Sequence, residues 1–146
     1  MSRNPLVIAV GRVAWGYVFF YCALPFGYMN YATIDLMPDW ACYAFILAAL
    51  PGLALAEKSS ALLRPLAWIL LAAEAIAWLL ALLGISPDSG MLYTIVSAVI
   101  TVVSLYFHFQ LLTNVADIAA RYSERRARSI RILRNVTVVL GTITFL

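Results

Sequence analysis

Residues 121–134, with the sequence RYSERRARSIRILR, decide the fold that we expect for this chain. The segment holds six of the ten basic residues, and long apolar stretches lie before it and begin within it. Arginine is costly in the bilayer core, and short loops that cross the membrane rarely carry it. The segment is therefore expected to form a cytoplasmic loop, and this assignment fixes the side of every other loop.

The composition is typical of a membrane protein. Hydrophobic residues make up 64% of the 146 residues and charged residues 12%, and the mean hydropathy is +0.93. These residues cannot supply the charged surface that a soluble domain of this size needs. Several continuous apolar runs approach the ~20 residues that cross ~30 Å of hydrocarbon as a helix. The expected fold class is all-α, an integral membrane helical bundle of about five transmembrane helices that forms a single domain, residues 1–146.

The apolar runs and the turn residues between them predict five spans. We expect helices near residues 6–28, 38–56 and 62–83, from 91 to well past 114, and from 124 onward, with Ser123 as the last N-cap. The first run is too long for the apolar region of a signal peptide, so we expect it to be retained. Twelve residues follow Arg134, about 18 Å of helix. Either the last arginines extend toward the inner interface, or the last helix is incomplete and the chain truncated.

The loop charges predict one orientation. Arg3, Lys58 and Arg64 flank the same ends of the spans as the arginine loop, whereas residues 30–40 and 84–90 contain acids and no base. The positive-inside rule then places the N-terminus in the cytoplasm. The basic residues cluster beside spans, so no nucleic acid is expected as a partner. Six arginines are expected to contact anionic lipid headgroups: Arg121, Arg125, Arg126, Arg128, Arg131 and Arg134.

Four of these arginines recur at every third position, as in the charged helix of voltage sensors. Such a helix needs apolar residues between the arginines and acids on neighbouring helices. Arg126 and Ser129 interrupt the pattern. A basic anchor to lipid headgroups is the preferred interpretation.

Glu74 is the polar residue that stands out. It lies within LAWILLAAEAIAWLLALL, residues 66–83, where an acid costs about 3 kcal/mol at the centre of a span. Tyr17 and Thr101 fall at similar depths, and both can hydrogen-bond a carboxyl group. A dry site would favour the neutral acid. Either Glu74 ties three helices together, or it carries a proton or cation, or it contacts a ligand.

Four hydroxyl residues and one histidine form a stripe, the hydroxyl stripe, on the fourth predicted span. They recur at intervals of three and four, which places them on one helical face: Thr94, Ser97, Thr101, Ser104 and His108. Small hydroxyl residues let membrane helices pack closely, so we expect a packing seam, with a hydrated pathway as the alternative.

Arg12 and His108 are expected in the inner leaflet. Arg12 should extend inward and meet His108 or Gln110, and a direct pair with Glu74 is the second possibility. His108 is expected to be a packed, hydrogen-bonded residue rather than a catalyst. Gly11 and Gly16 are positions where a neighbouring backbone can approach.

Several features cluster where the second span begins. Pro38 suits the first turn of a helix, and Asp35 and Asp39 then lie near the positive end of its dipole. We interpret both acids as capping residues, with an outward cation or ligand contact as the alternative.

Trp40 and Tyr43 fit the aromatic belt at the outer interface. Two cysteines, Cys22 and Cys42, are expected near that face as free thiols, with a disulfide as the alternative.

The stretch DLMPDWACY, residues 35–43, follows an aromatic first span containing Gly16. It resembles a pattern, Asp-x-Leu-Pro-Asp-x-x-Gly-Tyr, at the entrance to the second helix in a group of small, uncharacterised bacterial polytopic membrane proteins. Met37 stands at the leucine and Cys42 at the glycine, so close helix approach is not expected at Cys42. The resemblance implies a fold type but no activity. We expect a multi-pass protein of the bacterial cytoplasmic (inner) membrane.

No enzyme motif is present, and we expect no catalytic residue, cofactor or metal site. The first expected function is a structural, accessory or partner-binding subunit, whose partners are membrane lipids and a membrane protein or a second copy of the chain. The alternative is a small transporter or proton-coupled carrier with Glu74 as its titrating group, and an intramembrane enzyme comes third. A carrier should show a cavity at Glu74, a structural protein a dry Glu74 capped by hydroxyls, and an enzyme several converging polar groups.

Overall fold

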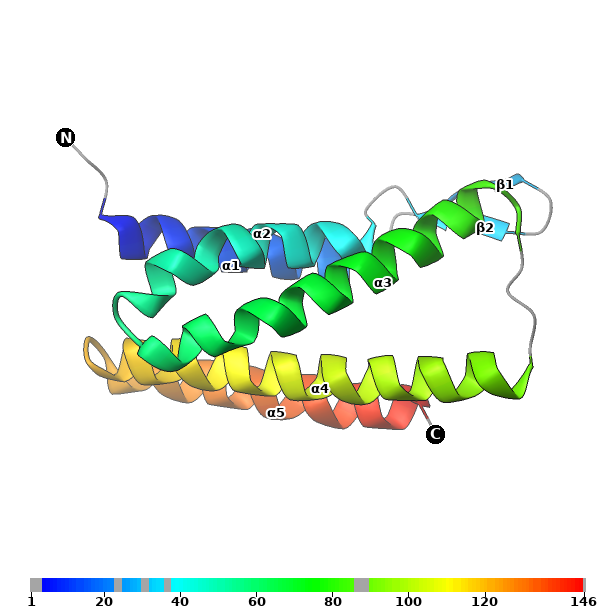
Figure 1. Cartoon of the computed structure of the whole chain (residues 1–146). Helices are drawn as coiled ribbons and strands as arrows, with labels where there is room; N and C mark the ends of the chain where they lie inside the picture. The colour runs from blue at the N-terminus through cyan, green and yellow to red at the C-terminus, as the bar shows by residue number, and fades with distance from the viewer. Residues whose placement is uncertain (1–3, 23–24, 30–31, 36–37, 86–89, 146) are drawn as a thin grey trace.

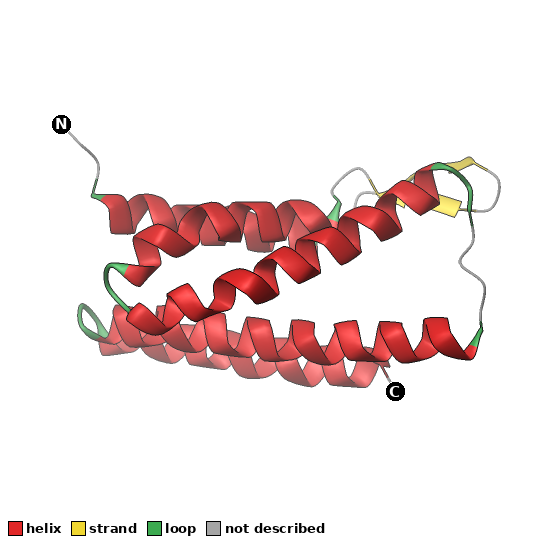
Figure 2. Cartoon of the chain, viewed as in Figure 1, coloured by secondary structure: helices red, strands yellow, loops and turns green. Residues whose placement is uncertain are grey.

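The computed structural model describes residues 4–22, 25–29, 32–35, 38–85 and 90–145, which fold into helices and one short β-hairpin (Figures 1 and 2). The helices are α1 (Pro5–Tyr21), α2 (Asp39–Ala54), α3 (Arg64–Leu82), α4 (Met91–Ala120) and α5 (Glu124–Phe145). A 3-10 turn, η1 (Lys58–Leu63), leads into α3, and strands β1 (Pro25–Met29) and β2 (Ala32–Asp35) pair antiparallel.

Two helical stretches are long and apolar enough to cross a membrane by length and composition. They are Lys58–Leu82, which joins η1 to α3, and Met91–Ala120, which is α4. Pro5–Tyr21 and Asp39–Ala54 are shorter apolar helices. The helical fold class is confirmed at this level.

Four of the predicted helices have nearly the expected bounds, but the first does not. α1 ends at Tyr21 rather than near residue 28, and Pro25–Met29 form a strand that the sequence analysis did not predict. Pro25 lacks the amide hydrogen that would continue the helix, and Gly27 is a poor helix former, so the chain leaves α1 early. At the end of α3, Gly84 has a φ of 66°, and its amide and that of Ile85 bond Ala81 and Leu80. This αL turn ends α3 cleanly.

Glycines set the close packing of α1 against α2. A Cβ on Gly16 would lie 3.0 Å from the Cys42 carbonyl oxygen, and one on Gly52 would lie 2.8 Å from the Ala9 Cβ. The prediction for Gly16 is therefore confirmed, whereas nothing lies within 4 Å of a Cβ on Gly11. Close approach at Cys42, which its substitution for glycine argued against, does occur because Gly16 supplies the space.

A second antiparallel pair, α4 and α5, lies opposite α1 and α2, and α3 runs obliquely between the two pairs (Figure 1). α3 starts near the end of α4 and finishes beside β2 (Figure 1). The first two turns of α4, residues 91–97, are exposed. The packing of α4 is therefore concentrated in its second half.

The two basic loops lie at the same end of the bundle. The Arg121 guanidinium donates to the Ala56 carbonyl at 2.8 Å and pairs with Glu57 at 3.0 Å, so it binds the turn between α2 and η1. The buried Asn114 amide lies 3.2 Å from the Ser60 hydroxyl. The β-hairpin is at the opposite end (Figure 1). Arg3 and Asp88, which also entered the orientation argument, lie outside the described residues.

Candidate functional site

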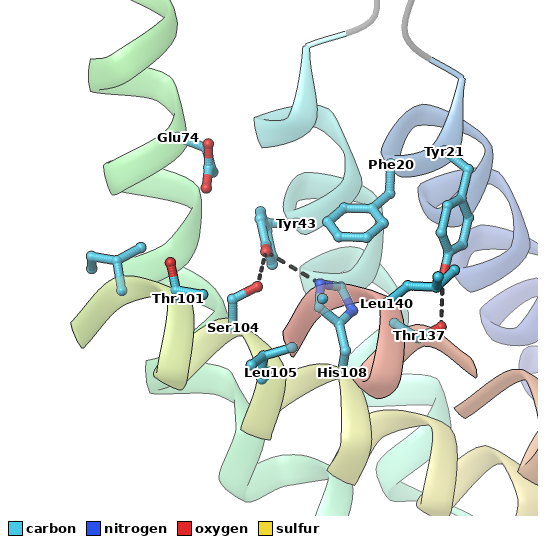
Figure 3. A pocket seen from close by; sticks show the side chains of 12 residues that line it. Phe20, Tyr21, Tyr43, Glu74, Thr101, Ser104, Leu105, His108, Thr137 and Leu140 are labelled. Carbon is cyan, nitrogen blue, oxygen red and sulfur yellow. Dashed lines mark hydrogen bonds between the residues drawn. The ribbon is translucent and has the colours of Figure 1, made fainter. Parts of the chain in front are cut away.

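His108 joins three helices from the middle of the bundle. Its side chain is 2% exposed, and both ring nitrogens are hydrogen-bonded: Nδ1 lies 3.0 Å from the Tyr17 hydroxyl on α1, and Nε2 lies 3.2 Å from the Tyr43 hydroxyl on α2. The Tyr43 hydroxyl also lies 3.0 Å from the Ser104 hydroxyl (Figure 3). The expectation of a packed, hydrogen-bonded histidine is confirmed.

Tyr43 is a residue whose role the sequence analysis missed. Its assignment to the interfacial aromatic belt is wrong, because the side chain is 1% exposed and points into the bundle. The signal available was its position, one turn into α2 and on the same face as Ile46 and Leu50, which are also buried. A tyrosine near a span end can therefore serve the core as well as the interface.

A cavity of about 410 Å³ lies beside His108, and each of the helices α1 to α5 contributes to its wall (Figure 3). Its polar lining residues are Tyr21, Tyr43, Glu74, Thr101, Ser104, His108 and Thr137. Its apolar lining residues are Phe20, Ile100, Leu105, Leu140 and Gly141. On the far side, the Tyr21 hydroxyl is hydrogen-bonded to Thr137, which ties α1 to α5.

Glu74 is the residue that α3 contributes to this cavity (Figure 3). It is partly exposed, and it makes no hydrogen bond or ion pair with any residue that the structure describes. The prediction that Tyr17 and Thr101 would bond it is wrong. Tyr17 bonds His108, and Thr101 donates to the Ser97 carbonyl of its own helix at 2.9 Å. Depth along a span does not determine which way a side chain points around its helix.

Arg12 does not meet His108, Gln110 or Glu74, so those predictions are also wrong. Its guanidinium donates to the Ala48 carbonyl of α2 at 2.7 Å. Pro51 lies inside α2 and lacks the amide hydrogen that would bond the Leu47 carbonyl, and Arg12 bonds the next carbonyl along the helix. Gln110 instead pairs with Asn114.

The hydroxyl stripe of α4 is only partly a packing seam. Ser104 and His108 bond Tyr43 across the helix interface, as the seam predicts. Thr94 and Ser97 are exposed, and Thr94 donates to the Gly90 carbonyl of its own chain segment. Thr101 lies between these two groups and lines the cavity. The stripe thus passes from an exposed surface to the cavity wall.

The six arginines expected at lipid headgroups fall into two sets. Three contact protein groups: Arg121 binds Glu57, Arg131 binds Glu124 at 2.9 Å, and Arg134 binds Thr113 at 3.1 Å and lies over the Phe109 ring. The remaining three are exposed on α5, namely Arg125, Arg126 and Arg128. Their contact with lipid stays a prediction.

The predictions for the residues around the start of α2 are confirmed in part. Asp39 occupies the first turn of α2, although Pro38 is the N-cap rather than a residue of the first turn. Asp35 ends β2, and the prediction for its side chain lies outside what the structure describes. Cys22 and Cys42 are free thiols, as predicted.

The cavity offers binding groups more readily than catalytic ones. Both nitrogens of His108 are engaged by tyrosines, so this histidine is not available as a base to a neighbouring nucleophile. No three His, Cys, Asp or Glu side chains of the described chain come together as metal ligands would. Comparison with protein-family models, with curated proteins and with solved structures found no match to the chain. The resemblance at residues 35–43 therefore stays a prediction.

Proposed function

We propose that this chain is a five-span helical protein of the bacterial cytoplasmic membrane and acts as a small proton-coupled carrier, with Glu74 as its titrating group. The observation that carries the proposal is the position of Glu74, which lines a cavity of about 410 Å³ and bonds none of the described residues. A carboxyl group placed in this way can exchange a proton without first breaking a structural hydrogen bond.

The exposed surface supports the membrane location. Large apolar side chains stand exposed along three helices, including Trp68, Ile76 and Leu79 on α3, Val99 and Val102 on α4, and Val139 and Ile143 on α5. A soluble monomer rarely exposes so much contiguous apolar surface to water. α1 and α2 have 17 and 16 residues, somewhat fewer than the ~20 of a typical span. Spans of this length are accommodated by local thinning of the bilayer.

The distribution of basic residues supports the orientation. Lys58, Arg64 and Arg121 lie at one end of the bundle together with the exposed arginines of α5, whereas Asp35 lies at the other end. By the positive-inside rule, the basic end faces the cytoplasm.

The structural role that we expected first required a dry Glu74 capped by hydroxyls. Its two expected partners bond other groups, and Glu74 lines an open cavity. An intramembrane enzyme that uses a histidine base is not favoured, because both ring nitrogens of His108 bond tyrosines. The carrier is therefore the function that the geometry of the cavity favours.

Proton flux in liposomes tests the proposal. Liposomes containing the wild-type chain should dissipate an imposed pH difference faster than empty liposomes, and Glu74→Gln should reduce the rate to that of empty liposomes, because an amide does not exchange protons in this way. Asp117→Asn serves as the matched control, since Asp117 is an exposed acid of α4 outside the cavity.

Thermal unfolding in detergent separates the carrier from the structural role. Glu74→Leu should unfold at the same temperature as the wild type, because no described partner is lost. Wild-type flux equal to that of empty liposomes, or full flux in Glu74→Gln, contradicts the carrier. A marked loss of stability in Glu74→Leu would favour the structural role.

A further inference from the structure

We infer that the cavity beside Glu74 binds a small protonated primary amine with an apolar body. The inference rests on the proposed function, because the ammonium group would take the place of the proton on Glu74. It follows from the charge, the hydrogen-bonding groups and the shape of the cavity wall.

The charge of the wall favours a cation. Glu74 is the one acid among the lining residues, and none of them is lysine or arginine. The nearby basic side chains of the bundle are used elsewhere, because Arg12 binds the Ala48 carbonyl and Arg134 binds Thr113. A carboxylate in an apolar bundle needs a compensating charge. A ligand with a single positive charge supplies it, and an anionic ligand does not.

The hydrogen bonds within the wall favour a ligand that donates. Thr101 gives its hydroxyl hydrogen to the Ser97 carbonyl, and Thr137 gives its hydrogen to the Leu133 carbonyl, both at 2.9 Å. The hydroxyl oxygen of Thr101 therefore keeps its lone pairs for a ligand. With the carboxylate of Glu74, the α3–α4 side of the cavity presents acceptors. A primary ammonium group carries three donors and no acceptor, which matches this arrangement.

The rest of the wall favours an organic body. Phe20, Leu105 and Leu140 line the cavity on the side away from the acid (Figure 3), and Ile100 is a further apolar lining residue. The volume of about 410 Å³ falls within the range of roughly 300–1,000 Å³ typical of small-molecule sites. An inorganic cation would need several oxygen ligands around it, and it would leave the apolar surface unused.

The exchange at Glu74 is balanced. The neutral acid releases its proton to water, and the resulting carboxylate pairs with the ammonium group. When the amine leaves, a proton returns to the same oxygen. Because one group binds either the proton or the amine, movement of one across the membrane would be linked to movement of the other.

Titration calorimetry of the full chain in detergent tests the inference with four probes. Benzylamine, which is protonated at neutral pH, should bind. Benzyl alcohol and phenylacetate, which keep the ring but lack the positive charge, should bind on the order of tenfold or more weakly. Benzyltrimethylammonium keeps the charge but has no N–H donor, and it should bind with intermediate affinity.

Variants locate the site. Glu74→Gln should weaken benzylamine binding on the order of ten- to a hundredfold, while Asp117→Asn leaves it unchanged. Thr101→Val should weaken benzylamine binding by about three- to tenfold but leave benzyltrimethylammonium unaffected, because only the amine donates to that oxygen. Partitioning of the probes into the micelle is common to all variants and cancels in the comparison.

The outcomes separate this inference from the carrier function. Equal binding of benzylamine and benzyl alcohol, or benzylamine binding unaffected by Glu74→Gln, overturns the amine site. Glu74-dependent proton flux without benzylamine binding overturns the amine site and leaves the carrier standing. Glu74-dependent benzylamine binding without proton flux supports the amine site and contradicts the carrier.

Discussion

His108 is bonded through both ring nitrogens, and the two tyrosines that hold it come from different helices. Its hydrogen-bonding capacity is therefore fully used inside the bundle. This arrangement explains how one polar ring is accommodated among Phe20, Phe107 and the other apolar side chains that surround it. It also fixes the positions of α1 and α2 relative to α4.

We predict that His108→Leu lowers the free energy of unfolding by about 1–3 kcal/mol, because the Tyr17 hydroxyl loses its partner in a buried place. Tyr43 is less affected, since it keeps Ser104. Unfolding of the purified protein in mixed micelles measures the change. Adding Tyr17→Phe to His108→Leu should recover part of the loss, because no hydroxyl is then left unpaired. An additive loss in the double variant would contradict this account.

The sequence indicated which single residues are unusual, but it did not predict which groups they bond. The scarcity of polar residues in the spans identified Glu74, Arg12 and His108 as unusual, and all three do lie in helices. Their partners were not predictable, because counting residues from a span end gives depth and leaves the rotation of each helix undetermined. Arg12 shows a second reason, since its partner is a backbone carbonyl near Pro51 that no side-chain pattern reveals.

At the level of elements, α1 and α2 pack through positions without a side chain. A Cβ on Gly16 would meet the Cys42 carbonyl oxygen, whereas a Cβ on Gly11 of the same helix would meet no atom within 4 Å. Gly11 and Gly16 therefore form a matched pair within one helix. The approach at Gly16 is against backbone, which cannot move aside as a flexible side chain can.

We predict that Gly16→Ala lowers the free energy of unfolding by about 1–3 kcal/mol, because the added methyl group forces the two helices apart. Gly11→Ala should instead raise it by up to about 1 kcal/mol, since alanine is favoured over glycine inside a helix. Both variants can be compared by the same unfolding measurement. Equal effects of the two substitutions would show that the contact with the Cys42 carbonyl does not limit the packing.

Element bounds followed from hydropathy wherever a clear terminator was present. Gly84 ends α3, and α5 begins at Glu124 directly after Ser123, whose carbonyl accepts from Ala127. The predicted end of α1, near residue 28, was wrong because the apolar run continues past Tyr21 into the hairpin. Hydropathy cannot tell an apolar strand from an apolar helix over so few residues.

At the level of the whole molecule, the bundle has a basic end and an end that carries the hairpin. Lys58 is exposed at the first, and Ile85 is exposed just after α3 at the second. The proposed orientation in the membrane rests on this asymmetry together with the positive-inside rule.

We predict that single cysteines at these two positions label differently in intact cells. In a background of Cys22→Ser and Cys42→Ala, an impermeant thiol reagent added outside should modify Ile85→Cys and not Lys58→Cys. Both positions should react after the cells are opened. Labelling of Lys58→Cys alone in intact cells would reverse the orientation, and labelling of both would contradict the arrangement of the spans.

The order of helix contacts has a consequence for biogenesis. α1 packs on α2, and α4 packs on α5, so most of the tight interfaces join neighbours in sequence. Contacts between sequence neighbours form quickly, and synthesis delivers the N-terminal pair first. In the proposed five-span arrangement, each pair can enter the bilayer as a helical hairpin, with α3 between the two. Each helix contributes to the cavity wall, so the cavity forms only when the second hairpin has docked. A nascent chain halted before α5 should then be inserted but unable to bind the proposed amine.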